Sequence, residues 1–86
     1  MITHKLQKSI LATNIANQLP VLKRIIFANK DVTFDLSNVS NIDSAGIAFL
    51  IELKNTAANK SCNLVFINPS TQINNLCQLY KITLEP

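Results

Sequence analysis

Glycine is almost absent from this chain, which has a single glycine, Gly46, among its 86 residues. A chain with one glycine has no glycine-rich loop of the kind whose backbone amides surround a phosphate group. Proline is also scarce, with three residues, whereas hydrophobic residues make up 48% of the sequence. This balance is typical of a folded globular chain and not of a disordered linker. The length fits one small domain, and we expect residues 1–86 to form it.

Residues that bind metals or form disulfides are equally few. The two cysteines, Cys62 and Cys77, lack Cys-x-x-Cys spacing, and the single histidine, His4, has no second ligand nearby in the sequence. We therefore predict no metal site, no cofactor and two free thiols in the core instead of a disulfide. No hydrophobic run approaches the roughly 20 residues that span a bilayer, and the N-terminus lacks the apolar stretch of a signal peptide. The expected location is the cytoplasm.

Acidic residues are few as well, with five against eight lysines and arginines, which gives a net charge of +3. The basic residues are spread along the chain, and Lys23-Arg24 is their one adjacent pair. Modules that bind nucleic acid usually carry a clustered basic stripe with interleaved aromatic residues, whereas most aromatic residues here lie in apolar runs typical of a core. We therefore expect no nucleic-acid binding.

Hydrophobic periodicity predicts an alternation of helices and strands over most of the chain. The predicted elements are a strand within residues 6–11, a second strand or a turn in 12–17, a helix over 19–30, a strand over 32–37, a helix over 47–59, a strand over 62–67 and a helix after residue 70. Pro20 suits the first turn of the first helix. Such alternation predicts the α/β fold class, with a parallel or mixed sheet and helices that cover at least one face.

The start of the central helix holds the most informative residues. Asp43 and Ser44 can each accept a hydrogen bond from the first turn, so either one is a candidate N-cap. Gly46 is unusual at a helix start unless some other group approaches closely. On a helical wheel, one face carries Ile47, Leu50, Lys54, Ala57 and Ala58, with Ile51 and Leu53 at its edges. We assign this face to the core.

The opposite face of the helix is our candidate docking patch. It carries Ala45, Ala48, Glu52, Asn55, Thr56 and Asn59, with Phe49 at its margin. Small residues beside a helix N-terminus let the backbone of another protein come close, and the partial positive charge of the free amides favours a polar or acidic group. A simpler interpretation is that the alanines only favour helix formation and that Ser44 is only a cap.

The segment from Phe34 to Leu50 resembles the signature of the STAS domain family. The chain reads Asp35-Leu36-Ser37-Asn38-Val39-Ser40-Asn41-Ile42-Asp43-Ser44-Ala45-Gly46-Ile47, where the family pattern is DLS-x-V-x-x-[ILV]-D-[ST]-[SAG]-G-[LI]. The resemblance implies a STAS-like mixed sheet flanked by helices. Before residue 19 the chain departs from the family, because the usual two-strand entry with a glycine-containing turn is not visible.

The resemblance also implies a function in docking onto another protein. The implied partner-binding residues are Asp43, Ser44, Ala45, Gly46, Ala48, Phe49 and Glu52. In the anti-sigma factor antagonists of this family, a Ser or Thr directly before the glycine is phosphorylated by a partner kinase. Ala45 occupies that position here, so no phosphorylation is expected there, and Ser44 is the alternative acceptor.

The form of the motif, together with the segment Cys77-Gln78-Leu79-Tyr80-Lys81-Ile82, is most similar to the MlaB-like branch of the family. That branch implies a non-catalytic cytoplasmic subunit that binds and regulates or stabilises the MlaF-like ATPase of an Mla-type ABC transporter for phospholipid, with an indirect link to the membrane permease. It implies no direct binding of lipid or nucleotide. The alternative is an anti-sigma factor antagonist that binds an anti-sigma kinase. We also expect weak self-association of the isolated domain.

An enzyme is the third class of function, and it has little support in the sequence. Asp35 and Asp43 are the acidic residues nearest the motif, but no histidine, cysteine or second carboxylate lies at a spacing that suggests a nucleophile with its base. A strand surface and a helix start explain both residues. We therefore predict no catalytic residues.

Overall fold

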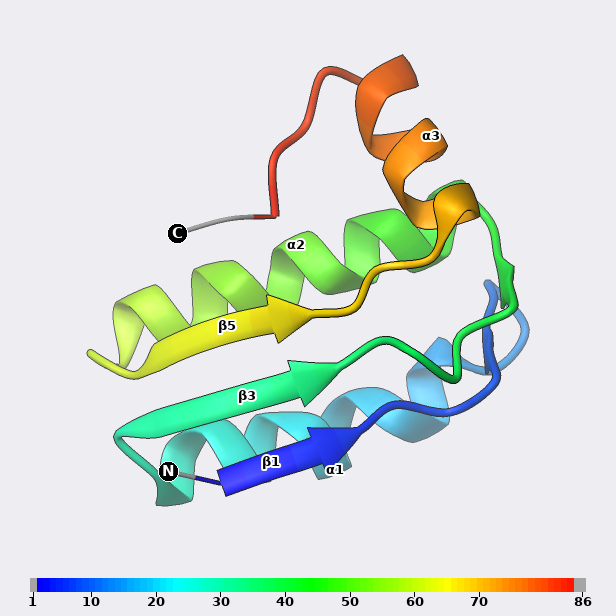
Figure 1. Ribbon diagram of the computed structural model, residues 1–86. Coiled ribbons are helices and arrows are strands. Elements are labelled where there is room, and N and C mark those ends of the chain that lie inside the picture. Colours follow the sequence, from blue (N-terminus) through cyan, green and yellow to red (C-terminus); the bar gives the residue numbers. More distant parts are fainter. Residues whose placement is uncertain (1, 85–86) are drawn as a thin grey trace.

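The computed structural model of the chain describes residues 2–84 (Figure 1). In chain order, its elements are β1 (Ile2–Lys5), β2 (Ser9–Ile10), α1 (Ile15–Ala28), β3 (Asp31–Asp35), β4 (Asn41–Ile42), α2 (Ser44–Asn59), β5 (Asn63–Ile67) and α3 (Thr71–Leu79). The structure confirms the α/β fold class. Among these helices, none is both long enough and apolar enough to cross a membrane.

The strands form two parallel sheets. The larger sheet has the order β1-β3-β5, with Ile2 opposite Val32 and Val32 opposite Leu64, and the smaller sheet pairs β2 with β4. Each pairing is parallel, so over residues 2–84 the parallel alternative of the prediction is confirmed, and the mixed sheet that the resemblance implied is wrong in this detail. The physical reason is that α1 separates β1 from β3 and α2 separates β3 from β5, so each connection returns the chain to the same end of the sheet.

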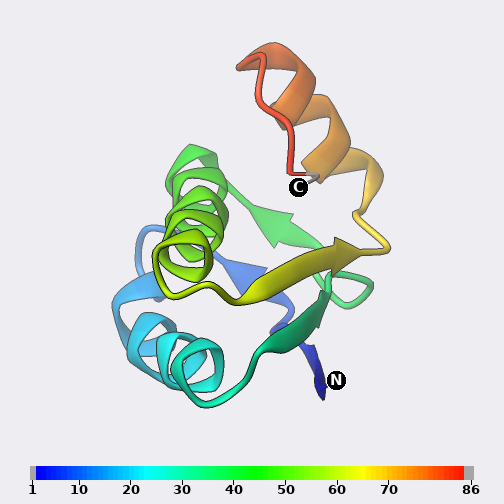
Figure 2. The ribbon, with the colours of Figure 1, turned by 90° about the vertical axis from the view of Figure 1, so that its left-hand side faces the viewer.

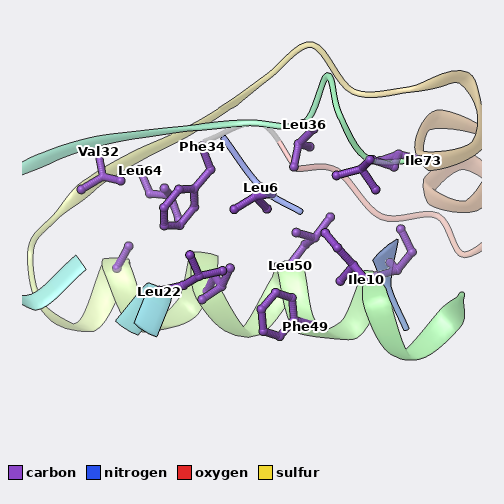
Figure 3. Close-up of a cluster of buried hydrophobic side chains, with 14 of the residues drawn as sticks. Leu6, Ile10, Leu22, Val32, Phe34, Leu36, Phe49, Leu50, Leu64 and Ile73 are labelled. Carbon is purple, nitrogen blue, oxygen red and sulfur yellow. The ribbon is translucent and has the colours of Figure 1, made fainter. Parts of the chain in front are cut away.

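Helices α1 and α2 cover one face of the larger sheet, and no helix formed by residues 2–84 covers the opposite face (Figures 1 and 2). The core lies between these two layers. Figure 3 shows Val32, Phe34 and Leu64 of the sheet pointing toward Leu22 of α1 and Leu50 of α2. The predicted inward positions of the central strand, Val32, Phe34 and Leu36, are all buried.

The first segment differs from its prediction. Residues 6–11 were expected to form one strand, but the chain leaves one sheet and joins the other within this stretch. Leu6 still donates its amide to the Asp35 carbonyl of the larger sheet at 2.9 Å, whereas the Lys8 carbonyl already accepts from the amides of Ser40 and Asn41 at 2.9 and 3.1 Å. The change of sheet explains why this stretch has no regular alternation.

Helix α1 begins four residues earlier than predicted, at Ile15, so Pro20 lies inside the helix and not in its first turn. A side-chain network supports the earlier start. Asn14 Oδ1 accepts from the Leu11 amide at 2.9 Å and from Gln18 Nε2 at 3.0 Å, and Gln18 Nε2 also donates to the Ser9 carbonyl at 3.1 Å. Because this network orders residues 9–14, the helix begins at Ile15, before the proline that was expected to mark its first turn.

Helix α2 spans Ser44–Asn59 and has Asp43 as its N-cap, so the structure selects one of the two candidate caps. Its buried side differs from the predicted face. Phe49 and Leu53 are 4% and 0% exposed, whereas Ala58 is exposed. The difference arises because α2 contacts α1 as well as the sheet, so its buried surface is turned toward α1.

The C-terminal elements agree with the periodicity. The predicted strand over 62–67 corresponds to β5, and Ser70 caps α3 by accepting a hydrogen bond from the Ile73 amide at 3.2 Å. Cys62 and Cys77 are buried and free, as predicted. Burial raises the pKa of both thiols, with a further contribution at Cys62 from the charge of Asp31.

Candidate functional site

The carboxylate of Asp43 is bound by backbone amides from two parts of the chain. Its Oδ1 accepts from the Gly46 amide at 2.9 Å, which caps α2, and its Oδ2 accepts from the Ala12 amide at 3.1 Å. These hydrogen bonds, that of Ala12 first and that of Gly46 next, lower the pKa of Asp43 below its usual value of 3.8. Asp43 therefore joins the loop before α1 to the first turn of α2.

Gly46 is buried, and its close neighbour belongs to the same chain. A Cβ atom added to Gly46 would overlap the carbonyl oxygen of Ile10 and would lie 2.6 Å from Cγ1 of Ile42. The sequence suggested that a glycine here admits the backbone of another protein. The structure shows that the backbone it admits is that of β2, so the packing of the small sheet against α2 accounts for this glycine.

An apolar groove of about 400 Å³ lies between α1 and α2, toward the N-terminal end of each helix. Its walls are Ile15, Ala16 and Leu19 from α1 and Ala45, Ala48, Phe49 and Glu52 from α2. We call it the α1/α2 groove. Glu52 is the one charged residue in this lining, and its carboxylate forms an ion pair with Lys23 Nζ at 3.3 Å. This ion pair also connects the two helices.

A second groove of about 260 Å³ lies on the other side of Ala48. We call it the α2/C-terminal groove, and it is lined by Ser44, Ile47, Ala48, Ile51, Tyr80 and Ile82. Ala48 is exposed and borders both grooves, so it forms a low ridge between them. A surface with this shape accepts two apolar side chains, one on each side of a methyl group.

The structure brings together most of the predicted partner-binding residues. Ala45, Ala48, Phe49 and Glu52 line the α1/α2 groove, and Ser44 and Ala48 line the α2/C-terminal groove. Phe49 contributes at the base of its groove, because its side chain is only 4% exposed. Gly46 is buried under this surface and Asp43 is half-buried beside it, and both are occupied by contacts within the chain.

Sequence reasoning missed the other walls of both grooves. Ile15 and Leu19 stand four residues apart, which is the spacing of one helix face, but the predicted helix began too late to include Ile15. Tyr80 and Ile82 reach the site from the far end of the chain. No local pattern around residues 43–52 indicates them.

Within residues 2–84, no group of three or more histidine, cysteine, aspartate and glutamate side chains is placed to hold a metal ion. The apolar lining of both grooves suits contact with another apolar surface.

Comparison with known proteins agrees with the motif. The family model described as the STAS domain matches residues 2–85. The chain belongs to the STAS domain family. STAS domains occur in anti-sigma factor antagonists and in transporter-associated proteins, and they are generally non-catalytic.

This STAS domain is also similar to a protein of Arabidopsis thaliana called "Probable sulfate transporter 3.3", with 44% identity over 39 residues. The aligned segment covers 45% of the chain and 6% of that transporter. The similarity therefore concerns a small part of the transporter.

Proposed function

We propose that this STAS domain is a non-catalytic docking module that binds a partner protein over the two grooves beside Ala48. The observation that carries the proposal is an exposed ridge of one methyl group between two apolar grooves, next to the start of α2. Covering these grooves removes apolar surface from water, which contributes about 25 cal/mol per Å² toward a complex, against the entropic cost of association.

Docking at this site rests on shape and apolar contact more than on capture of an acidic group. The Gly46 amide is already bound by the carboxylate of Asp43, and the Ile47 amide donates to the Asp43 carbonyl at 3.1 Å. A negative charge brought to the helix start would also meet the carboxylate of Asp43. An apolar partner surface avoids this repulsion.

For the partner, we propose the ATPase subunit of an Mla-type ABC transporter for phospholipid, with the domain held at the inner membrane through that subunit. The support is the motif Asp43-Ser44-Ala45-Gly46-Ile47. The domain would act through binding energy: by binding one conformation of the ATPase more tightly, it increases the population of that conformation. It would itself hold neither lipid nor nucleotide.

The alternative is an anti-sigma factor antagonist, and one observation favours it. Ser44 is the first residue of α2 and its side chain is exposed, so a kinase can reach its hydroxyl. A phosphate there would face the positive end of the helix but would also lie beside the carboxylate of Asp43. Ala45, at the position that is usually phosphorylated, counts against this alternative.

The test is capture of the tagged chain from its source organism, with identification of the bound proteins by mass spectrometry. Three forms are compared: the original chain, Ala48→Arg and Asn59→Arg. Asn59 is an exposed residue at the far end of the same helix, so its substitution controls for the added charge. We expect Ala48→Arg to lower recovery of the partner about tenfold or more and Asn59→Arg to leave it unchanged.

The outcomes separate the two functions. Recovery of an ABC ATPase with its membrane subunit supports the transport function, and recovery of an anti-sigma kinase supports the regulatory one. Equal recovery with all three forms means that the partner binds elsewhere on the domain. Circular dichroism of each purified form confirms that the loss is not caused by unfolding.

A further inference from the structure

Strand β5 is an edge strand whose outer backbone groups lack a strand partner within residues 2–84. The Asn63 amide donates to the Lys30 carbonyl at 2.7 Å, and the Ile67 carbonyl accepts from the Leu36 amide at 2.9 Å. The backbone amide and carbonyl groups of successive residues point to opposite sides of a strand. Those of Leu64 and Phe66 therefore point away from β3. The sheet order β1-β3-β5 places no described strand on that side.

The β5 edge also lacks the charged side chains and prolines that usually prevent strand addition. Its five residues, Asn-Leu-Val-Phe-Ile, include no charged residue and no proline, and Val65 on the uncovered face is 39% exposed. Edge strands are usually protected by charged side chains, by proline or by very short length. The opposite edge, β1, carries such a charge in Lys5.

Two hollows flank the free edge of β5, one near each end of the strand. The first, of about 670 Å³, is lined by Lys54, Ala57, Ala58, Ser61, Cys62, Asn63, Leu64 and Val65. The second, of about 410 Å³, is lined by Phe66, Pro69, Asn74, Cys77, Gln78, Ile82, Thr83 and Leu84. Leu64 borders one hollow and Phe66 the other, two residues apart, or roughly 7 Å along the strand. Alternate side chains of an extended chain have this same spacing.

We propose that the β5 edge is a second docking site, which takes an extended segment of a partner protein as an added strand. The segment would pair with the backbones of Leu64 and Phe66 and place large apolar side chains at alternate positions into the two hollows. Among residues 2–84, the side chains that line the two hollows are uncharged apart from Lys54, whose Nζ donates to the Thr83 carbonyl at 3.2 Å, so apolar side chains of the segment suit both hollows.

The surroundings of β5 favour one added strand over a second copy of the domain. Figure 1 shows α3 and the segment that follows it on the β5 side of the sheet, and residues 82–84 share a hollow with Phe66. A second copy would bring its whole sheet, and not one strand, to the side where α3 and residues 82–84 already lie. A single strand needs only the space next to β5. The proposal does not depend on the function proposed for the grooves beside Ala48.

The probe is a synthetic peptide with blocked ends and the sequence Glu-Thr-Leu-Thr-Leu-Thr-Glu, added to the isotope-labelled domain and followed by NMR. We expect saturable shifts centred on the amides of Leu64 and Phe66, and exchange of these two amides with solvent slowed about tenfold. The amides of Thr3 and Lys5, on the other edge of the sheet, serve as the internal control. The absence of saturable shifts at about 1 mM peptide would overturn the proposal.

Two further comparisons distinguish strand pairing from nonspecific apolar contact. In an added strand, only every second peptide amide faces β5, so methylation of the two leucine amides and methylation of two threonine amides must affect binding unequally. Equal binding of both methylated peptides contradicts the proposal. Ala58→Arg, which fills one hollow with a charged chain, should weaken binding about tenfold, whereas Ala28→Arg on the last residue of α1 should not.

One last variant distinguishes binding at the β5 edge from binding at the grooves beside Ala48. Ala48→Arg blocks the grooves of the proposed function and should leave peptide binding unchanged. Shifts centred on Ala45 and Ala48 that disappear in this variant would assign the peptide to those grooves and refute the β5 site. This result would not count against the proposed function.

Discussion

Gly46 has no Cβ atom, and the carbonyl oxygen of Ile10 occupies the space where one would lie. Its role follows from this contact and not from backbone freedom, because Gly46 lies inside α2 and none of the described residues with a positive φ is a glycine. The close approach lets the small sheet pack directly on the first turn of α2. The surface beside Ala48 therefore depends on a residue that does not line it.

We predict that Gly46→Ala destabilises the domain by about 2 kcal/mol or more, because the added methyl group forces β2 and α2 apart. The measurement is the free energy of unfolding from urea titration. Ala45→Gly is the matched control, and it should cost only about 1 kcal/mol because it removes helix propensity without a clash. A Gly46→Ala variant as stable as the original chain would contradict this account of the packing.

The lowered pKa of Asp43 predicts how the stability of the domain depends on pH. Because hydrogen bonds from Ala12 and Gly46 lower its pKa in the folded state, its contribution to stability is present above the ordinary value of 3.8 and is lost as the pH falls through the lower folded value. Asp43→Asn should therefore melt at a lower temperature than the original chain at pH 7. The difference between the two melting temperatures should shrink as the pH falls below 3.8.

Thermal melts followed by circular dichroism at several pH values test this prediction. The pKa of Asp35 is also lowered, chiefly by the Ser37 amide, but this effect is present in both proteins and cancels in the comparison. If the difference between the two melting temperatures stayed constant down to pH 3, titration of Asp43 would not contribute to stability.

At the scale of the element, α1 contains a proline, which is a residue type that disfavours helix formation. Pro20 is the sixth of its 14 residues and has no amide hydrogen to donate to the carbonyl of Ala16. Both residues are exposed, so water can reach that carbonyl. Leu22 and Ile26 hold the helix by their burial against the core, which outweighs the missing hydrogen bond.

Replacing Pro20 should therefore stabilise the domain. We expect Pro20→Ala to raise the free energy of unfolding by about 1 kcal/mol, because the gain in the helix is offset in part by the greater freedom of the unfolded chain. Equilibrium unfolding in urea measures the change. Pro69→Ala, in the connection before α3, is the control, and a similar gain there would show that the effect does not arise in the helix.

At the scale of the whole molecule, Cys62 and Cys77 report on whether the domain unfolds as one unit. They lie in different parts of the fold, directly before β5 and within α3, at 7% and 9% exposure. Burial raises the pKa of both thiols, so few thiolates form near neutral pH and few are accessible.

We expect both thiols to react slowly with a disulfide reagent in the folded protein and rapidly in urea, with one common midpoint that coincides with the loss of helix signal. Single variants, Cys62→Ala and Cys77→Ala, assign the reaction to each thiol. If Cys77 became reactive at a lower urea concentration than Cys62, α3 would open before the sheet does.

Several features of this STAS domain follow from the sequence alone, because short-range physics determines them. The alternation around Phe34 predicts a strand that is buried on one side, and Ser70 followed by apolar residues at helical spacing predicts α3. Asp43 is one of the two caps that the sequence offered, because its carboxylate can reach an amide three residues away, and the structure selects it over Ser44. The motif from Asp35 to Ile47 likewise indicates the family from adjacent residues.

Other features depend on contacts between segments that are distant in the sequence. Whether Phe49 faces solvent or core depends on the position of α1, and the neighbour of Gly46 is a strand 36 residues earlier, since that strand ends at Ile10. Local periodicity cannot report the direction from which another segment approaches. The sequence by itself therefore determined the elements from residue 32 onward in outline, the two candidate caps of α2 and the family. Only the tertiary structure decided which walls complete the grooves beside Ala48 and which strand leaves its edge free.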